Sequence, residues 1–140
     1  MVPTIKRPIN ITEGRFNLRE VSFEIVKRFA SKGAKERVSI SNTQNTLWFA
    51  VSYRNNIIGV CGLYLAKNKC RIKGDYLLPE YRGKGIGEFI TISRMSIIKS
   101  LGYANIEVLT LHPQYYAKIG FNIHKETRKG IWYGTKRLDE

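Results

Sequence analysis

The segment from residue 82 to residue 87, Arg-Gly-Lys-Gly-Ile-Gly, combines residue types that suit the binding of a phosphate group. An apolar strand is predicted to end at Pro79, before this segment, and an amphipathic pattern typical of a helix begins at Ile86 and continues to about Leu101. Backbone N–H groups at the start of a helix attract anions, and glycines let a phosphate approach the main chain. Arg82 and Lys84 add positive charge beside those amides. The segment is therefore predicted to bind a phosphate or diphosphate; the alternative is an ordinary strand-to-helix turn with solubilising charges.

The glycine spacing separates this segment from two common nucleotide-binding loops. It fits neither the G-x-G-x-x-G pattern of dinucleotide-binding folds nor the G-x-x-x-x-G-K-[ST] pattern of phosphate-binding loops. It resembles instead the R/Q-x-x-G-x-G/A signature of the GNAT N-acetyltransferase superfamily, in which this loop binds the pyrophosphate of coenzyme A. The resemblance implies acetyl-CoA as the cosubstrate. It assigns coenzyme binding to Leu77, Leu78, Arg82, Gly83, Lys84, Gly85, Ile86 and Gly87.

A second motif, Tyr116-Ala117-Lys118-Ile119-Gly120-Phe121, follows further along the chain. It resembles the Y-x-x-x-G-F ending of the same superfamily, and the order of the two motifs also agrees. The resemblance places the Tyr116 phenol near the coenzyme sulfur, and a tyrosine pKa of about 10 suits protonation of a leaving thiolate. Tyr116 is therefore the expected general acid. Tyr115 would replace it if the helix were rotated by one residue, and a packing role for Tyr116 is the alternative.

Acyl transfer to an amine also needs a polarised thioester carbonyl and a deprotonated amine. The resemblance implies that a backbone N–H near Leu77 or Leu78, beside a bulge, polarises the carbonyl. Asp75 is a candidate base that orders a water, although relatives place their acid most often at the position that Gly74 occupies here. His112 is a second candidate, because its near-neutral pKa suits collection of a proton through water; its ordinary role would be capping or packing. An amine that arrives neutral needs no dedicated base.

The N-terminal third is predicted to begin with a short edge strand over residues 3–11, where two prolines disfavour a central strand. Asn17 and Glu20 have the spacing of a capping box and predict a helix that ends at Gly33. The polar face of this helix and the loop after it are basic. In the superfamily this region shapes the acceptor pocket.

The rest of the chain is predicted to form further strands around the glycine segment. They are expected over residues 47–53, 57–65, 70–78, 104–110, 121–126 and 131–138. The first three of these form an antiparallel meander with a turn at Asn55-Asn56. The helix from Ile86 then crosses over to a parallel strand, and a short helix begins at Pro113. The resemblance implies a GNAT fold of α/β (α+β) class, with a mixed sheet of about six to seven strands, a splayed parallel pair and about three to four flanking helices.

Composition favours one domain over residues 1–140, because 43% of its 140 residues are hydrophobic. The sequence has no apolar run of about 18 residues and no apolar signal-peptide centre near Met1, so we expect a cytoplasmic protein without a membrane span. Cys61 and Cys70 are expected to be buried free thiols without a metal. A disulfide or a catalytic thiol is the alternative. A monomer and a homodimer are both compatible with the sequence.

The charge is unusual: 24 Lys and Arg residues against 11 Asp and Glu residues give a net charge of +13. Such a charge attracts polyanions, so nucleic acid, a nucleic-acid-associated protein or another acidic partner is a candidate for the amine acceptor, whose identity the sequence does not give. A general composition bias is the alternative. The basic chain also resembles tRNA-directed GNAT toxins and the phage Mom type of DNA-modifying protein. The leading prediction is an acyl-CoA-dependent N-acyltransferase, and its rivals are a nucleic-acid-binding protein of the same fold without acetyltransferase activity and an interaction module.

Overall fold

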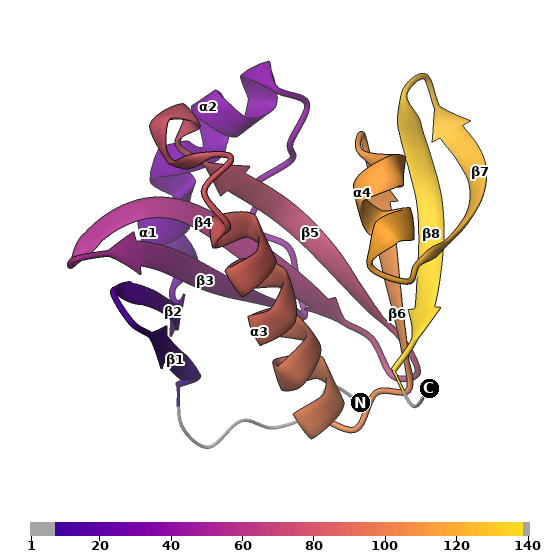
Figure 1. Cartoon of the computed structure of the whole chain (residues 1–140), viewed down its shortest axis with the longest axis horizontal. Coiled ribbons are helices and arrows are strands. Elements are labelled where there is room, and N and C mark those ends of the chain that lie inside the picture. Colours follow the sequence, from indigo (N-terminus) through magenta and orange to yellow (C-terminus); the bar gives the residue numbers. More distant parts are fainter. Residues whose placement is uncertain (1–7, 139–140) are drawn as a thin grey trace.

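An eight-stranded mixed sheet in the order β1-β2-β3-β4-β5-β6-β8-β7 organises the computed structural model, which describes residues 8–138 (Figure 1). The strands are β1 (Asn10–Glu13), β2 (Phe16–Val21), β3 (Thr46–Tyr53), β4 (Asn56–Leu65), β5 (Cys70–Leu77), β6 (Asn105–Thr110), β7 (Asn122–Arg128) and β8 (Ile131–Arg137). Every neighbouring pair is antiparallel except β5 and β6, which are parallel. The predicted mixed sheet with one parallel pair is confirmed, with one strand more than expected.

The helices lie on both faces of this sheet. They are α1 (Phe23–Val26), the 3-10 turn η1 (Lys27–Phe29), α2 (Ala30–Lys35), the 3-10 turn η2 (Pro79–Tyr81), α3 (Ile86–Ser100) and α4 (Pro113–Lys118). The long helix α3 covers one face of β2–β5, and α1 and α2 lie behind those strands (Figure 1). Within residues 8–138, no helix is both long and apolar enough to cross a bilayer.

The extra strand is β2, and it shows that the predicted capping box at Asn17 and Glu20 is wrong. Both residues lie within β2, where Leu18 is fully buried and Arg19 is exposed, as in a strand with one face in the core. The Asn17 side-chain amide donates to Asn10 Oδ1 across the β1–β2 hairpin at 2.5 Å instead of capping a helix. The first helix begins only after Ser22. Side chains that can cap a helix can equally serve a hairpin, and local spacing did not separate the two.

Two other boundaries moved by a few residues. The edge strand β1 runs over Asn10–Glu13, so it overlaps the expected range of residues 3–11 only at its end; residues 8 and 9 are not in a strand, and residues 1–7 lie outside the described part of the chain. The first turn of the meander uses Arg54 and Asn55, whose φ angles are 48° and 72°, whereas Asn56 already belongs to β4. The turn is thus one residue earlier than predicted.

A β-bulge in β5 reverses the faces of that strand. The register passes from Gly62 opposite Lys73 to Val60 opposite Tyr76, so β5 carries one residue more than β4 between these pairs. Gly74 makes the bulge with a φ of +67°. Before it, Ile72 packs in the core under α3; after it, Tyr76 packs in the second core, under α1 and α2. Asp75 is thereby turned toward α3.

The parallel strands β5 and β6 separate after a short paired stretch. Their pairing runs from Cys70 opposite Ile106 to Ile72 opposite Val108. Beyond these pairs β5 continues to Leu77 and β6 to Thr110, and the two strands diverge toward the start of α3 (Figure 1). The splay that the resemblance implied is therefore present.

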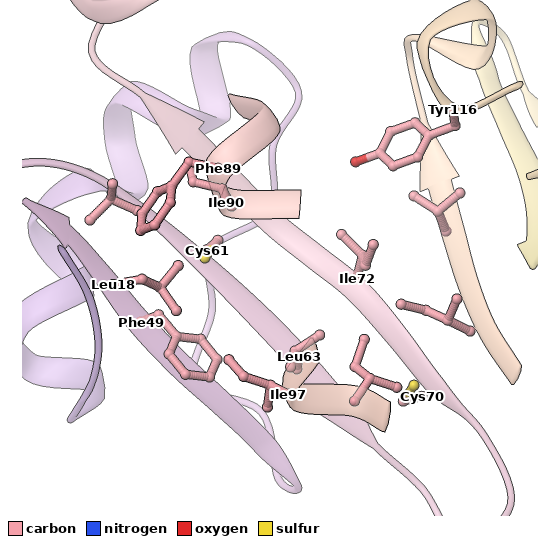
Figure 2. Packing of buried hydrophobic residues seen from close by; sticks show 14 of the residues in the cluster. Leu18, Phe49, Cys61, Leu63, Cys70, Ile72, Phe89, Ile90, Ile97 and Tyr116 are labelled. Carbon is pink, nitrogen blue, oxygen red and sulfur yellow. The ribbon is translucent and has the colours of Figure 1, made fainter. Parts of the chain in front are cut away.

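Apolar side chains fix α3 against the sheet. Phe89, Ile90 and Ile97 of the helix point toward Leu18 and Phe49 of the strands (Figure 2). Burial of each large apolar side chain contributes about 1.5–3 kcal/mol to the free energy of unfolding. The first turn of α3 and the glycine segment before it are thus held at the open end of the splay.

Candidate active site

The glycine segment ends at α3 and leaves its first amides open. Gly83 and Gly85 have φ angles of +74° and +83°, a region that side-chain-bearing residues rarely adopt. Gly85 is the N-cap, and Phe89 N–H donates to its carbonyl at 3.2 Å. Within residues 8–138, the protein provides no acceptor for the next N–H groups, those of residues 86–88. A side-chain carbon built at Gly83, Gly85 or Gly87 would meet no atom within 4 Å, so an anion has free access to these amides.

Arg82 is engaged elsewhere in this structure. Its Nε donates to the Leu77 carbonyl at 2.8 Å, and its Nη2 lies 2.8 Å from Glu36 Oε1. The hydrogen bond to Glu36 raises the pKa of Arg82 above its usual range. Arg82 therefore connects the glycine segment to the end of α2, and Lys84 is the cation of this segment without an ion-pair partner among the described residues.

The end of β5 directs one amide into the splay. Leu78 N–H donates to the Ile58 carbonyl of β4 at 2.8 Å, so it is already used. Amides alternate in direction along an antiparallel ladder, and the N–H of Leu77 therefore points away from β4. The Leu77 carbonyl, which accepts from Arg82, faces the same way. Of the two candidate polarising amides, Leu77 is the one directed at the gap.

Asp75 pairs with a residue that the motif analysis missed, Arg94 of α3. The Arg94 side chain is fully buried; its Nη1 donates to Asp75 Oδ1 at 2.6 Å, and its Nη2 donates to Asp75 Oδ2. Nη1 also donates to the Gly62 carbonyl at 3.2 Å, whereas Nε has no partner among the described residues. Burial opposes the charge of Arg94, but Asp75 outweighs it and the pKa of Arg94 is raised. Asp75 is thus the counterion of Arg94, and 39% of its side chain is exposed.

A sequence signal for Arg94 exists. It shares helical spacing with Ile90 and Ile97 on the buried face of α3, where a charged residue is rare unless it is paired. The bulge at Gly74 explains the partner, because it turns Asp75 to this face of the sheet.

Tyr116 lies at the edge of the splay, and the residue is only 8% exposed. Phe121 and Tyr115 pack edge-on against this ring, each at a centroid distance of 5.2 Å. Figure 2 shows the Tyr116 hydroxyl directed from α4 toward β5 and α3. Burial is the main cause that raises the pKa of Tyr116 above its usual range, so the phenol stays protonated and remains a hydrogen-bond donor.

Tyr115 and His112 take different positions around α4. The Tyr115 hydroxyl lies 3.2 Å from Thr91 Oγ1 of α3 and therefore joins the two helices. His112 is the exposed N-cap residue of α4, but its side chain makes no capping hydrogen bond. Its backbone N–H donates to Thr110 Oγ1 at 2.8 Å. The imidazole of His112 is thus left at the groove, without the capping role that sequence alone suggested for it.

A groove of about 1300 Å³ lies along β5, β6, the start of α4, the loop after α2 and the β7–β8 hairpin. It brings together five of the predicted site residues, namely Asp75, Leu77, Arg82, His112 and Tyr116. The glycines and Lys84 do not line it; they lie beyond Arg82 at the start of α3. The volume exceeds the roughly 300–1,000 Å³ of a typical small-molecule pocket, so the groove has room for parts of two ligands.

The cysteines do not contribute a nucleophile. Cys61 and Cys70 are buried and free, as predicted. Burial is the main cause that raises the pKa of each thiol to about 12. A thiol with such a pKa is almost fully protonated at neutral pH, which excludes the catalytic-thiol alternative.

Comparison with known proteins identifies related sequences and folds. A family model described as "Acetyltransferase (GNAT) family" matches residues 16–121. An uncharacterized N-acetyltransferase of Chlorobaculum tepidum is 26% identical over 106 residues, which cover 73% of this chain and 68% of that protein.

Solved structures with low sequence identity share the fold. N-acetylglutamate synthase from Neisseria gonorrhoeae, solved with coenzyme A and N-acetyl-glutamate, is 14% identical with a TM-score of 0.73; the match covers 91% of this chain but only 36% of the synthase. A GNAT family acetyltransferase from Elizabethkingia anophelis, solved with acetyl-CoA bound, is 15% identical with a TM-score of 0.67. In that case 89% of this chain and 99% of the other are covered.

Proposed function

Because the chain belongs to the acetyltransferase (GNAT) family, we propose that it moves an acetyl or related acyl group from acetyl-CoA to an amine, by direct attack in a ternary complex. The observation that carries this proposal is the set of unpaired amides at the start of α3, next to the open end of the splay. A diphosphate at these amides would leave the rest of the coenzyme free to extend along β5. The coenzyme-bound structures of the Neisseria and Elizabethkingia proteins support the same cosubstrate.

The acyl group would lie between Leu77 and Tyr116. The amine nitrogen attacks the thioester carbon, and the Leu77 N–H stabilises the negative charge that forms on the carbonyl oxygen. As the carbon–sulfur bond breaks, Tyr116, whose hydroxyl is directed toward β5 and α3 (Figure 2), donates its proton to the thiolate and regains one from solvent. The amine loses its proton to a water at the groove wall, and His112 is the candidate that collects it. Because both Asp75 oxygens accept from Arg94, the role of Asp75 in this scheme is to order that water.

Turnover tests the proposal directly. Purified protein is incubated with acetyl-CoA and a panel of amines, and release of free coenzyme A is followed by a thiol reagent. Because Cys61 and Cys70 are buried with raised pKa values, the protein's own thiols give a small background at neutral pH. Binding of acetyl-CoA in the micromolar range together with amine-dependent thiol release supports the enzyme. Absence of acetyl-CoA binding in calorimetry would contradict it.

We further propose that the amine belongs to a nucleic acid, and the net charge of +13 favours this acceptor. The same charge also supports the second candidate, a nucleic-acid-binding protein that has lost the chemistry. Two measurements separate them. An enzyme that acts on nucleic acid transfers radiolabelled acetyl groups to tRNA or DNA, whereas a pure binder shows salt-sensitive binding to the polymer without uptake of acetyl-CoA.

A further inference from the structure

The groove carries far more positive than negative side chains. Seven basic residues line it, against three carboxylates. The basic residues are Arg37, Lys69, Arg71, Lys73, Arg82, Lys125 and Arg128; the acidic residues are Glu36, Asp75 and Glu107. A groove of this composition attracts anions and repels simple polyamines.

Each of the three carboxylates is already paired with an arginine. Glu36 pairs with Arg82 at 2.8 Å, Asp75 with the buried Arg94, and Glu107 with Arg71 at 3.0 Å. Tyr133 also donates to Glu107, at 2.8 Å, and Lys69 lies 3.9 Å from it. The acidic residues of the groove are therefore neutralised within the protein, and they do not balance the remaining cations.

Four of these cations have no carboxylate partner within residues 8–138, namely Arg37, Lys73, Lys125 and Arg128. Lys73 donates to a threonine, which leaves Arg37, Lys125 and Arg128. Lys125 and Arg128 lie on β7, one strand of the hairpin that forms a wall of the groove. Arg37 lies in the loop after α2, which forms the opposite wall. The nearby Glu126 is engaged by the hairpin itself, since its Oε2 accepts from Gly130 N–H at 2.8 Å.

The backbone at Arg37 is strained in a way that fixes the position of its side chain. Its φ is 61°, and its N–H donates to the Ala34 carbonyl at the end of α2. The left-handed conformation costs a residue with a side chain about 1–2 kcal/mol, which is why glycine is usual at this helix-ending position. A carbon built on Gly130 of the hairpin would lie 3.4 Å from Arg37 Nη1. The guanidinium thus reaches across the mouth of the groove to the wall that carries Lys125 and Arg128.

Lys73 also lies in the positive electrostatic potential of the groove. Lys73 donates to Thr43 Oγ1 at 3.0 Å instead of to a carboxylate. Burial and then the charge of Arg71 lower the pKa of Lys73. A bound ammonium group would experience the same repulsion.

We propose that Arg37, Lys125 and Arg128 form an anion-binding subsite for a phosphate group of the acceptor, so that the acceptor is an amine that also bears phosphate. This inference rests on the proposed acyltransferase function and names the substrate class of the same groove. Two guanidinium groups and an ammonium group match a phosphate, whereas a single guanidinium already satisfies a carboxylate. The phosphate can belong to a small molecule or to a nucleic-acid chain.

The positive charge of the groove beyond the subsite bears on deprotonation of the acceptor. Every carboxylate of the groove is paired, so a free carboxylate base is absent from its described lining. Cations near the bound amine lower the pKa of its ammonium form and increase the fraction of neutral nucleophile. The phosphate contributes binding, and the surplus positive charge favours loss of the proton.

Binding to the coenzyme-saturated protein tests the subsite. Saturation with coenzyme A first occupies the expected diphosphate site, so that it does not compete for the probes. The probes are adenosine 5′-monophosphate, adenosine, and a short single-stranded DNA of mixed sequence, each measured by calorimetry in low salt. We expect at least one phosphate-bearing probe to bind more tightly than adenosine. Similar affinity for the monophosphate and the DNA identifies a small phosphorylated acceptor, and preference for the DNA identifies a chain.

Variants separate the subsite from general charge. In Arg37→Ala/Arg128→Ala we expect affinity for the phosphate probe to fall about tenfold or more. The matched control is Arg15→Ala/Arg54→Ala, which removes the same charge at the β1–β2 and β3–β4 turns, outside the groove. The control should change affinity less than about twofold, through long-range electrostatics alone.

Two results overturn the proposal: equal losses in the double variant and its control, or no binding of either phosphate probe by protein that binds coenzyme A. A protein that fails to bind coenzyme A instead contradicts the proposed function, so the two failures are distinct. Arg37→Gly guards against misfolding, because it relieves the strain at φ 61° and should weaken phosphate binding in a more stable protein.

Discussion

Two parts of the candidate site are suited to anions, the coenzyme end at the start of α3 and the acceptor end on the walls of the groove, but they are built from different parts of the chain. At the start of α3, main-chain amides that follow Gly83 and Gly85 provide the donors. At the acceptor end, the side chains of Arg37, Lys125 and Arg128 come from two separate segments. A main-chain site fixes the geometry of its ligand and requires glycines, whereas a side-chain site sets charge and tolerates variation in sequence. The amides at the start of α3 therefore suit a ligand of constant shape, as proposed for the coenzyme, and the side-chain site suits a ligand that differs between related proteins, as proposed for the acceptor.

The largest expected effect on the free energy of unfolding concerns the pair of Asp75 and Arg94. Asp75→Ala leaves the fully buried Arg94 without its counterion, and we expect a loss of about 3 kcal/mol in the free energy of unfolding. Glu36→Ala removes the partner of Arg82, whose side chain is 42% exposed, and should cost less than about 1 kcal/mol. Urea denaturation of both variants measures the difference. Equal losses would show that Asp75 and Arg94 do not form the buried pair described.

The coenzyme end is tested by a glycine with a matched partner. Gly85 and Gly102 flank α3, both have positive φ, and a side chain at either would meet no protein atom within 4 Å. Valine should therefore strain both positions similarly. Only Gly85→Val places carbon atoms where the diphosphate is proposed to bind, and we expect about a hundredfold loss of acetyl-CoA affinity there. If calorimetry showed the same loss of acetyl-CoA affinity for Gly102→Val, the diphosphate would not bind at Gly85 as proposed.

Tyr116 is expected to affect turnover rather than binding. Tyr116→Phe keeps the ring contacts with Phe121 and Tyr115 but removes the proton donor, so kcat should fall about tenfold to a hundredfold while acetyl-CoA affinity changes little. Tyr115→Phe is the control, since it removes only the contact with Thr91. A larger effect of Tyr115→Phe than of Tyr116→Phe would exchange their roles.

The same residue gives a pH dependence. Burial raises the folded-state pKa of Tyr116, so its neutral form stabilises the fold fully below the unfolded tyrosine pKa of about 10. That contribution is lost as the pH rises from there through the higher folded value. Tyr116→Phe should therefore make the free energy of unfolding less sensitive to pH above about 10. Urea denaturation across alkaline pH measures the slope, and identical slopes for the two proteins would show that the phenol is not buried as described.

The smallest expected effect is on stability, and it distinguishes backbone strain at Arg37 from a role of its side chain in phosphate binding. Arg37 and Arg54 are both exposed residues with left-handed backbone, at φ 61° and 48°. Glycine at either position should raise the free energy of unfolding by up to about 1 kcal/mol. Only Arg37→Gly should also weaken binding of phosphate probes. If thermal denaturation showed no stabilisation in either variant, the left-handed backbone at these two positions would not be strained as described.

The sequence was informative about sites formed by contiguous residues and much less so about sites formed by distant segments. The glycine segment, α3 and the Tyr116 motif were predicted because contiguous residues carry both their shape and their chemistry. The strand β2 was mistaken for a helix start, because Asn17 and Glu20 suit a cap and a hairpin equally.

Contacts between distant segments were not predictable in this way. The pairing of Asp75 with Arg94 depends on a bulge at Gly74 that local sequence does not fix. Likewise, Arg37 approaches Gly130 only after the sheet has formed, since the two residues belong to separate walls of the groove. Propensity and periodicity describe single elements, whereas these contacts depend on register and on the placement of elements relative to one another.

The central claim is that main-chain amides at the start of α3 hold the diphosphate of the coenzyme. Titration of ¹⁵N-labelled protein with acetyl-CoA, followed by amide chemical shifts, measures this residue by residue. We predict the largest shifts at residues 84–88 and at Leu77, with little change at the β1–β2 turn around Arg15. Saturation by acetyl-CoA with unchanged amides at residues 84–88 would contradict the claim.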